Sequence, residues 1–213
     1  MSIRLEEVRT GSVRTYPGPD GRSWRSAIGK EAAAGPVTMT FLGLAGDTVG
    51  NPDVHGGADQ AVLAYAGEHY PLWRAEGLEA VPGSFGENFV LSGLTDAEAC
   101  VGDVYALGGA RVQISHPRQP CETLARRFGG KEVVARVWAT CRGGWYLRVL
   151  REGPVEAGMA LTLLERPNPG GTVARVLKAY LEAAKHPAEA RAMAALEGLT
   201  AEWRLKLGRK ADG

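Results

Sequence analysis

The run Val104-Tyr105-Ala106-Leu107-Gly108-Gly109-Ala110-Arg111-Val112-Gln113-Ile114-Ser115 decides the fold class. Two short segments rich in β-branched, aromatic and aliphatic residues flank a pair of glycines. This is the pattern of a β-hairpin whose strands are joined by a tight turn. The run therefore predicts antiparallel β structure in the middle of the chain.

Similar strand-like segments lie on both sides of the predicted hairpin. Residues 37–41 alternate apolar and polar side chains, and residues 61–65 form a short apolar run that fits a buried strand. Residues 145–150 and 160–164 flank a loop that contains glycine and proline. The 29 glycines of the chain favour many tight turns over long helices. We expect a mainly β domain over residues 1–166, built as a barrel or a sandwich.

A few helices interrupt the β-rich region. Helical spacing of apolar residues predicts helices over residues 68–76, 122–128 and 131–140. Gly129 follows the second of these segments and is a typical C-terminal cap. Pro120 and Cys121 then lie at the beginning of that helix.

The character of the sequence changes after Arg166. Pro167-Asn168-Pro169-Gly170-Gly171 is typical of a linker. Thr172 can cap one helix, His186-Pro187 begins a second that runs through Glu197, and Thr200 caps a short third that runs through Leu207. Residues 172–213 thus predict a small three-helix appendage. It is too small to hold a core alone, so it packs on the main domain or on another subunit.

Composition narrows the class of protein. The formal net charge of the 213 residues is +1, which gives no electrostatic case for nucleic acid or an anionic membrane. No apolar run is long enough to span a bilayer, and the first residues lack the apolar core of a signal peptide. Three widely spaced cysteines do not make a disulfide framework. A reducing cytoplasm is the expected compartment.

Cys121 is the strongest candidate for chemistry. A single cysteine is more often a buried structural thiol. Here Arg118 lies three residues away, a helix begins next to the thiol, and Pro117 and Pro120 stiffen the approach. Such surroundings lower the pKa of a thiol and favour the thiolate, which is both a nucleophile and a metal ligand. The other two cysteines, Cys100 and Cys141, lack this combination and are interpreted as structural.

Three further clusters are candidates for ligand binding. His55 precedes two glycines and a buried strand, which suggests close backbone approach to a ligand, while a plain turn explains it equally well. Glu87 and Asn88 are polar residues among aromatic ones, and contact either a ligand or each other. Lys30 follows a glycine and could bind an anion, although a lone lysine is more often a surface charge. No phosphate-binding P-loop, dinucleotide fingerprint or nucleophile-elbow motif occurs.

Taken in order, a set of motifs resembles the MOSC domain, named for the C-terminal domain of molybdenum-cofactor sulfurases, and in particular its bacterial YiiM type. The motifs are Gly29-Lys30-Glu31, Gly43-Leu44-Ala45-Gly46-Asp47, His55-Gly56-Gly57, Phe85-Gly86-Glu87-Asn88, Gly102-Asp103, Pro117-Arg118-Gln119-Pro120-Cys121 and Gly144-Trp145-Tyr146-Leu147-Arg148-Val149. The resemblance covers about residues 20–166, and the helical remainder resembles the small three-helix domain of that branch.

The resemblance implies a β-barrel-like fold that binds a molybdenum–pyranopterin cofactor (Mo-molybdopterin). The ligand cysteine of the family falls on Cys121. By the same resemblance, Lys30 and Arg118 match basic positions suited to the cofactor's phosphate, and Asn88 matches a polar position near the pterin. His55 is expected at the edge of the pocket with a catalytic role. Gly56 and Glu87 are expected to be further cofactor-binding residues.

The relatives that have an activity reduce N-hydroxylated compounds such as hydroxylaminopurines and amidoximes. This implies a small-molecule N-hydroxylated substrate and a separate flavin or iron–sulfur protein as the electron donor, because the chain carries no motif for either centre. His55 and His116 are the candidate proton donors. Two alternatives stay open, namely a non-catalytic carrier of the cofactor and a sulfur-transfer protein with a persulfide on Cys121. A homodimer also stays open.

Overall fold

The predicted hairpin forms strands β9 (Val104–Leu107) and β10 (Ala110–Pro117) in the computed structural model, which describes residues 2–18, 21–50 and 55–213. The two strands pair antiparallel with Leu107 opposite Ala110. Gly108 has a φ of 56°, in the left-handed region that a tight turn of this kind requires. Val112 and Ile114 are fully buried on the core face of β10. The turn and the alternation of the strand residues thus fix this part of the sheet.

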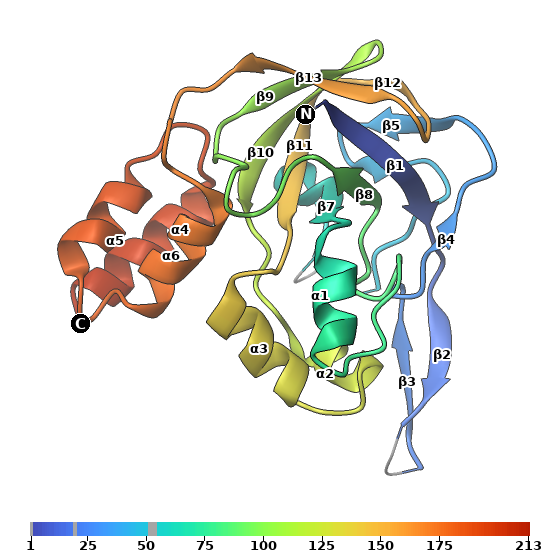
Figure 1. The fold of residues 1–213 in the computed structure, drawn as a ribbon, viewed down its shortest axis with the longest axis horizontal. Helices are drawn as coiled ribbons and strands as arrows, with labels where there is room; N and C mark the ends of the chain where they lie inside the picture. The colour runs from blue at the N-terminus through green and yellow to red at the C-terminus, as the bar shows by residue number, and fades with distance from the viewer. Residues whose placement is uncertain (1, 19–20, 51–54) are drawn as a thin grey trace.

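The sheet containing this hairpin closes into a barrel (Figure 1). Around the barrel the order is β13 (Ala160–Glu165), β9, β10, β11 (Trp145–Arg151), β7 (Val62–Ala66), β8 (Phe89–Ser92) and β1 (Ile3–Thr10). Pairing of Ile3 with Leu161 joins β1 back to β13 and closes the ring of seven strands. The predicted class, mainly β with a barrel-like domain and a few helices, is confirmed.

Short strands extend the barrel at its rim. Strands β2 (Arg14–Pro17) and β3 (Ser23–Ser26) form a projecting hairpin, and β4 (Glu31–Ala32) pairs with β1. Strands β5 (Val37–Thr40), β6 (Gly43–Leu44) and β12 (Gly153–Val155) form a separate three-stranded sheet. The loops that join these rim strands form one wall of a cavity in the barrel domain.

Strand β7 is buried on both of its faces, which explains its continuous apolar sequence. Val62 and Ala64 belong to the barrel core, whereas Tyr65 belongs to a second apolar cluster and stacks on Phe85 with ring centroids 4.4 Å apart. Helices α1 (His69–Ala75), α2 (Glu122–Arg127) and α3 (Glu132–Thr140) cover this second cluster. The three predicted helices are therefore confirmed within one or two residues at each end.

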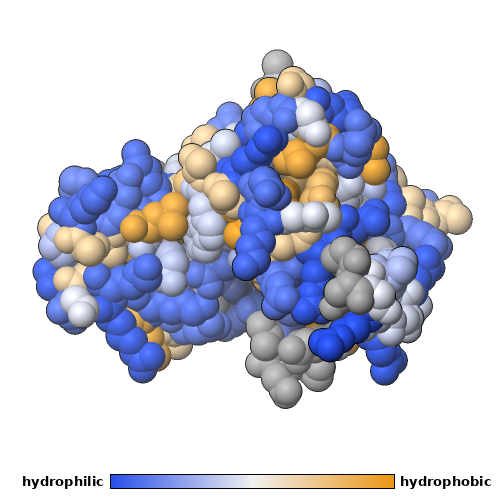
Figure 2. All heavy atoms as spheres, turned by 90° about the horizontal axis from the view of Figure 1, so that it is seen from below, coloured by the Kyte–Doolittle hydropathy of each residue, from blue (hydrophilic) through white to orange (hydrophobic). Residues whose placement is uncertain are grey.

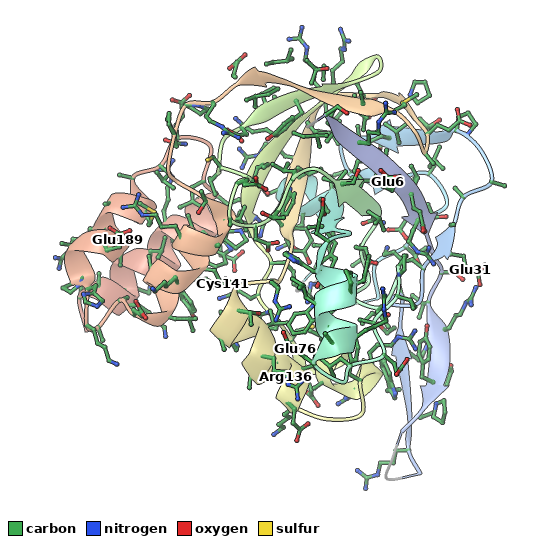
Figure 3. The ribbon with its side chains drawn as sticks, viewed as in Figure 1. Glu6, Glu31, Glu76, Arg136, Cys141 and Glu189 are labelled. Carbon is green, nitrogen blue, oxygen red and sulfur yellow. The ribbon has the colours of Figure 1, made fainter. Side chains whose placement is uncertain are left out.

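Helix α1 also makes the one parallel pairing of the described barrel possible. It connects β7 to β8, which run parallel, while the other neighbouring strands of the described barrel pair antiparallel. A parallel pair needs a crossover of this kind. Helices α1 and α3 are tied together because Arg136 donates a 2.7 Å hydrogen bond to the carbonyl of Glu76, two residues labelled in Figure 3.

Three helices follow the barrel and lie together beside it in Figure 1. They are α4 (Val173–Leu181), α5 (Pro187–Ala194) and α6 (Ala201–Ala211). The predicted caps are confirmed, since the hydroxyls of Thr172 and Thr200 each accept a hydrogen bond from a backbone amide in the first turn. Buried residues of the helices share one core cluster with the barrel. The expected packing on the main domain is confirmed, and the division at residues 166 and 172 stays a prediction.

Two helix ends differ from the prediction. Helix α5 ends at Ala194 instead of Glu197. The backbone groups of Glu197 are hydrogen-bonded to a side chain outside the helix, because Asn168 accepts a bond from the Glu197 amide and donates one to the Glu197 carbonyl. Helix α6 passes Leu207 and continues to Ala211. A Cβ built on Gly208 would meet open space, so this glycine costs the helix only about 1 kcal/mol of propensity.

Among the described residues, no helix has the length and apolar character needed to cross a membrane. Figure 2 shows one face of the molecule, on which hydrophilic residues cover most of the visible surface and hydrophobic residues form small separate groups.

Candidate functional site

A cavity of about 380 Å³ lies where the loops around one part of the barrel meet. Its walls come from the segments after β3, the β5–β6 turn and the loop beyond it, residues 55–63, the loop before β8, the loop before α2, and β11. Such a volume is typical of small-molecule sites. The cavity therefore gathers parts of the chain that are far apart in sequence.

The residues predicted to share one cleft do so. The cavity is lined by Lys30, His55, Gly56, Asn88, Arg118 and Cys121, together with other residues. The predicted convergence of Lys30, His55, Asn88, Arg118 and Cys121 is thus observed, and the roles of these residues in cofactor binding and catalysis stay predictions. Glu87, the remaining member of the predicted set, does not line the cavity.

Cys121 is the N-terminal cap residue of α2, and its side chain is half-buried at the cavity. Burial by itself raises the pKa of the thiol. A hydrogen bond from His55, the positive charge of Arg118 and the Leu124 backbone amide act in the opposite direction and bring the pKa down to about 6. The thiol is therefore largely ionised at neutral pH. The contributions of Arg118 and the helix start agree with the prediction, and that of His55 adds to it.

Arg118 is a buried cation at the cavity wall. Arg118 is 5% exposed, and its Nη2 donates a 3.4 Å hydrogen bond to the carbonyl of Phe85. Nη1 is buried and has no hydrogen-bond partner, and no carboxylate pairs with the guanidinium within the part of the chain that the structure describes. A buried charge without a partner is costly, so this guanidinium is suited to an anionic ligand.

Lys30 lies in the same cavity wall but already has a partner. Its ammonium is bound to the carboxylate of Asp47, and both side chains are nearly buried. Burial lowers the pKa of Lys30, and the Asp47 charge opposes that shift. Because its charge is compensated inside the protein, Lys30 attracts an anion less strongly than Arg118 does.

Asn88 completes the network around Asp47. Its amide nitrogen donates to Asp47 at 2.8 Å and to the carbonyl of Arg9 at 3.1 Å, and its amide oxygen accepts from the Leu63 backbone at 3.1 Å. The Gly11 amide donates to the same carboxylate at 2.8 Å. Every polar atom of the Asn88 amide thus has a protein partner, and Asp47 is the centre of the network.

Glu87 supports the site from behind its wall. Its carboxylate is completely buried and accepts bonds from the Tyr70 hydroxyl and from the backbone amides of Gly83 and Phe85. Burial raises its pKa, and these hydrogen bonds oppose the rise. Since the Phe85 carbonyl receives Arg118, Glu87 fixes the turn that holds Arg118 instead of touching the cavity itself.

His116 lies behind the cavity wall. Its ring stacks on Tyr146, a cavity-lining residue, with centroids 5.0 Å apart, and Nδ1 lies 3.0 Å from the Ser115 hydroxyl. Burial, followed by the charges of Lys206 and Arg148, lowers the pKa of His116 to about 3. The imidazole is therefore neutral at physiological pH and separated from the cavity by Tyr146.

Sequence reasoning missed two cavity residues. Gln60 has a buried side-chain oxygen with no hydrogen-bond partner among the residues described, and it lines the cavity. Asp47 stands in one of the quoted motifs, but no local pattern shows that it pairs with a lysine 17 positions earlier. Gln60 directly precedes a predicted buried strand, so its position at the strand's start was the one available signal.

The chain is similar to several known proteins. The MOSC domain family model matches residues 51–162. The YflK protein of Bacillus subtilis (strain 168) is 38% identical over 196 residues, which are 91% of this chain and 88% of that protein. The crystal structure of YiiM from Geobacillus stearothermophilus has a TM-score of 0.82 and 31% identity, and covers 98% of this chain and 99% of that one.

A fungal relative is longer. A Gibberella moniliformis (strain M3125 / FGSC 7600) protein named "Reductase" is 38% identical over 177 residues, or 81% of this chain. The chain spans 31% of that protein's length. The other part of the fungal protein has no counterpart in this alignment.

Proposed function

This chain belongs to the MOSC family, and on that premise we propose that it is a molybdenum cofactor-dependent reductase of N-hydroxylated compounds, supplied with electrons by a separate flavin or iron–sulfur protein. The observation that supports this most is the pair of Cys121 and Arg118, an ionised thiol and an unpaired buried cation at one cavity. The relative named a reductase supports oxidoreductase chemistry in the family. That protein is much longer than this chain, so its own activity is not transferred here.

The cavity residues fit a molybdenum–pyranopterin cofactor. The Cys121 thiolate is suited to hold the metal, because an ionised thiol is a soft metal ligand. Arg118 is suited to hold the phosphate, which would give the unpaired Nη1 an acceptor. The unpaired oxygen of Gln60 can accept a bond from an N–H group of the pterin. When bound, the cofactor supplies the two-electron chemistry that removes oxygen from an N–OH group.

The other polar residues of the wall then keep the site in shape. Lys30, Asp47 and Asn88 form a network of an ion pair and hydrogen bonds that fixes their part of the cavity wall. In this network the charge of Lys30 is balanced by Asp47, whereas Arg118 has no such partner among the described residues. Glu87 fixes the Phe85 turn. This reassigns Lys30, Asn88 and Glu87 from direct cofactor binding to support of the residues that would bind it.

Proton supply is assigned to His55. The overall reaction takes R–NHOH, two electrons and two protons to R–NH2 and water. His55 lines the cavity and is hydrogen-bonded to the Cys121 sulfur. It is therefore placed to supply a proton to an N–OH group bound in the cavity. His116 does not line the cavity and lies behind Tyr146, and its pKa is too low for it to be protonated to imidazolium at physiological pH, so it is not placed to supply the proton.

The apolar part of the cavity suits a flat ring. Leu42 and Val49 line it and are 71% and 40% exposed, which places them at its solvent-facing side. Apolar side chains at a cavity mouth favour a purine-sized or aryl substrate over a short polar one.

One purification tests this function. The protein is produced in a host able to make the cofactor, desalted, and analysed for molybdenum and pterin per chain. We expect both to be present, and we expect reduction of a hydroxylaminopurine when an electron donor is added. Cofactor that passes readily to an apo-enzyme without any reduction would favour a carrier. Persulfide on Cys121 with no molybdenum would favour the sulfur-transfer alternative.

A further inference from the structure

Two separate segments carry the chemically active residues of the cavity. The loop before α2 carries Arg118 and Cys121, and the segment of residues 55–60 carries His55 and Gln60 and includes the short 3-10 helix Ala58–Gln60. Neither segment belongs to a barrel strand. Loops of this kind need support from elsewhere if their side chains are to keep fixed positions.

Helix α6 reaches the first of these segments. The Lys206 ammonium donates a 2.7 Å hydrogen bond to the side-chain oxygen of Gln119, two residues before Cys121. Lys206 is itself held in place, because it pairs with Glu202 at 2.7 Å and lies 5.7 Å from the centre of the Trp203 ring. The last helix of the chain thus contacts the loop that carries the thiol.

The second segment is connected to the same group of helices through Arg148. Its Nε donates a 2.8 Å bond to the Asp59 carboxylate, and its Nη1 donates a 2.9 Å bond to the carbonyl of Gly198, just before α6. The Asp59 carbonyl also accepts a 2.6 Å bond from the Ser115 hydroxyl. Gly198 packs closely against the barrel, because a Cβ there would stand 2.8 Å from the Gly102 backbone.

A stack of rings lies between the two connections. Trp203 of α6 contacts His116, with centroids 6.0 Å apart, and His116 stacks on Tyr146 of the cavity wall. Trp203 is 1% exposed, so this contact is well packed. Residues 198–206 therefore contact the Cys121 loop directly, and they reach residues 55–60 through Arg148 and the cavity wall through His116.

We propose that Lys206 and Arg148 are positioning residues, and that through them the C-terminal helices brace both segments that carry the candidate site. Lys206 acts through Gln119 on the Cys121 loop, and Arg148 acts through Asp59 on residues 55–60. The brace itself follows from these contacts alone. It rests on the proposed function only in its effect on cofactor binding.

Hydrogen–deuterium exchange of the full chain tests the brace directly. In Lys206→Ala, we expect amides of residues 118–125 to exchange about threefold to tenfold faster, as the loss of one partly buried hydrogen bond predicts. Gln119→Ala should have the same effect, and the double variant should add nothing further. Lys206→Arg, which keeps a donor, should restore slow exchange. In Arg148→Ala, the faster exchange should fall on residues 58–63.

Matched controls separate positioning from general stability. Arg209→Ala removes an exposed arginine from the same helix, and Arg151→Ala removes an exposed arginine from the same strand as Arg148. Both variants should leave the two segments at the wild-type rate. Unchanged exchange at residues 118–125 in Lys206→Ala, or a uniform rise over the whole chain, overturns the proposal.

Molybdenum per chain after desalting is the second readout. Lys206→Ala should retain less than the wild type, and Arg209→Ala should retain the same amount. If the wild type holds no molybdenum, the proposed function fails while the exchange data still decide on the brace. If the exchange rates change as expected but molybdenum retention does not, the brace stands and its effect on cofactor binding is refuted.

Discussion

The ammonium of Lys30 is bound to the carboxylate of Asp47 in the cavity wall, where the two side chains are 8% and 12% exposed. The same carboxylate accepts bonds from Asn88 and from the Gly11 backbone. One acidic residue thus joins three segments of the rim, and the pair is a structural element of the wall.

Asp47→Asn should destabilise the protein by about 3 kcal/mol, because it leaves the buried Lys30 charge without its partner. The measurement is the free energy of unfolding from urea titration. The control is Glu31→Gln, whose pair with Arg14 is exposed to solvent and should contribute little to stability. Equal losses in the two variants would contradict the structural role of the buried pair.

Cys121 should react with iodoacetamide as a low-pKa thiol. The rate followed against pH should have a midpoint of about 6, because only the thiolate reacts. Arg118→Ala should move the midpoint upward by removing a positive charge. Cys141 is the internal control in the same digest, since burial and then the Asp96 charge raise its pKa. A midpoint for Cys121 at the ordinary value for a thiol would show that the local charges do not act on it.

Cys121→Ala should abolish reduction of an N-hydroxylated base and lower the molybdenum content, because it removes the proposed metal ligand. Cys100→Ala and Cys141→Ala should keep most of the rate and lose about 1–2 kcal/mol of stability at most. Rates are compared at equal molybdenum occupancy. Full activity of Cys121→Ala under that condition would refute the proposed ligand role.

Arg118→Ala should weaken retention of the cofactor, because its buried guanidinium is the one proposed to hold the phosphate. Added cofactor should partly restore activity. Arg118→Lys should fall between the alanine variant and the wild type, since lysine keeps the charge and loses the planar fork. The measurement is pterin per chain after dilution and desalting. Equal pterin in all three proteins would exclude Arg118 from phosphate binding.

His116 should make the protein less stable in acid. Burial, with Lys206 and Arg148 nearby, holds its pKa at about 3, below the unfolded value of 6.5. Between these two values the unfolded chain binds one more proton than the folded chain, so stability falls as the pH falls. The expected loss is about 1.4 kcal/mol per pH unit in this window.

The comparison for that prediction is His116→Gln, which cannot take up the proton. The free energy of unfolding is measured for both proteins at pH 7 and pH 5, which gives the pH dependence of stability for each. Carboxylates contribute equally to both proteins, so their effect cancels in the difference between the two pH dependences. The variant loses the stacking on Tyr146 at every pH, so only the change between the two pH values is informative. Parallel slopes would show that His116 is not buried as a neutral ring.

The barrel strands were predictable where a turn or a two-residue period marked them. The glycine pair between β9 and β10 and the alternation in β5 are local signals, and both gave the observed elements. Strands β1 and β8 were missed, although they pair with each other. Their pairing depends on partners far away in sequence, and β4 and β6, of two residues each, are too short for any period to show.

The candidate site was predictable in its members and less so in their connections. Arg118 and Cys121 lie in one short stretch, so their mutual effect could be inferred from spacing. The pairing of Lys30 with Asp47, and the enclosure of Glu87 by a turn, depend on how distant segments pack. For this reason the sequence indicated which residues gather at the cavity, but not which polar groups remain free to meet a ligand.

Closure of the barrel by β1 against β13 has a consequence for biosynthesis. Strand β1 leaves the ribosome early, yet its partner Leu161 is made only when nearly all of the barrel has been translated. During that interval one edge of β1 exposes unpaired backbone groups, which are sites for aggregation and for chaperone binding.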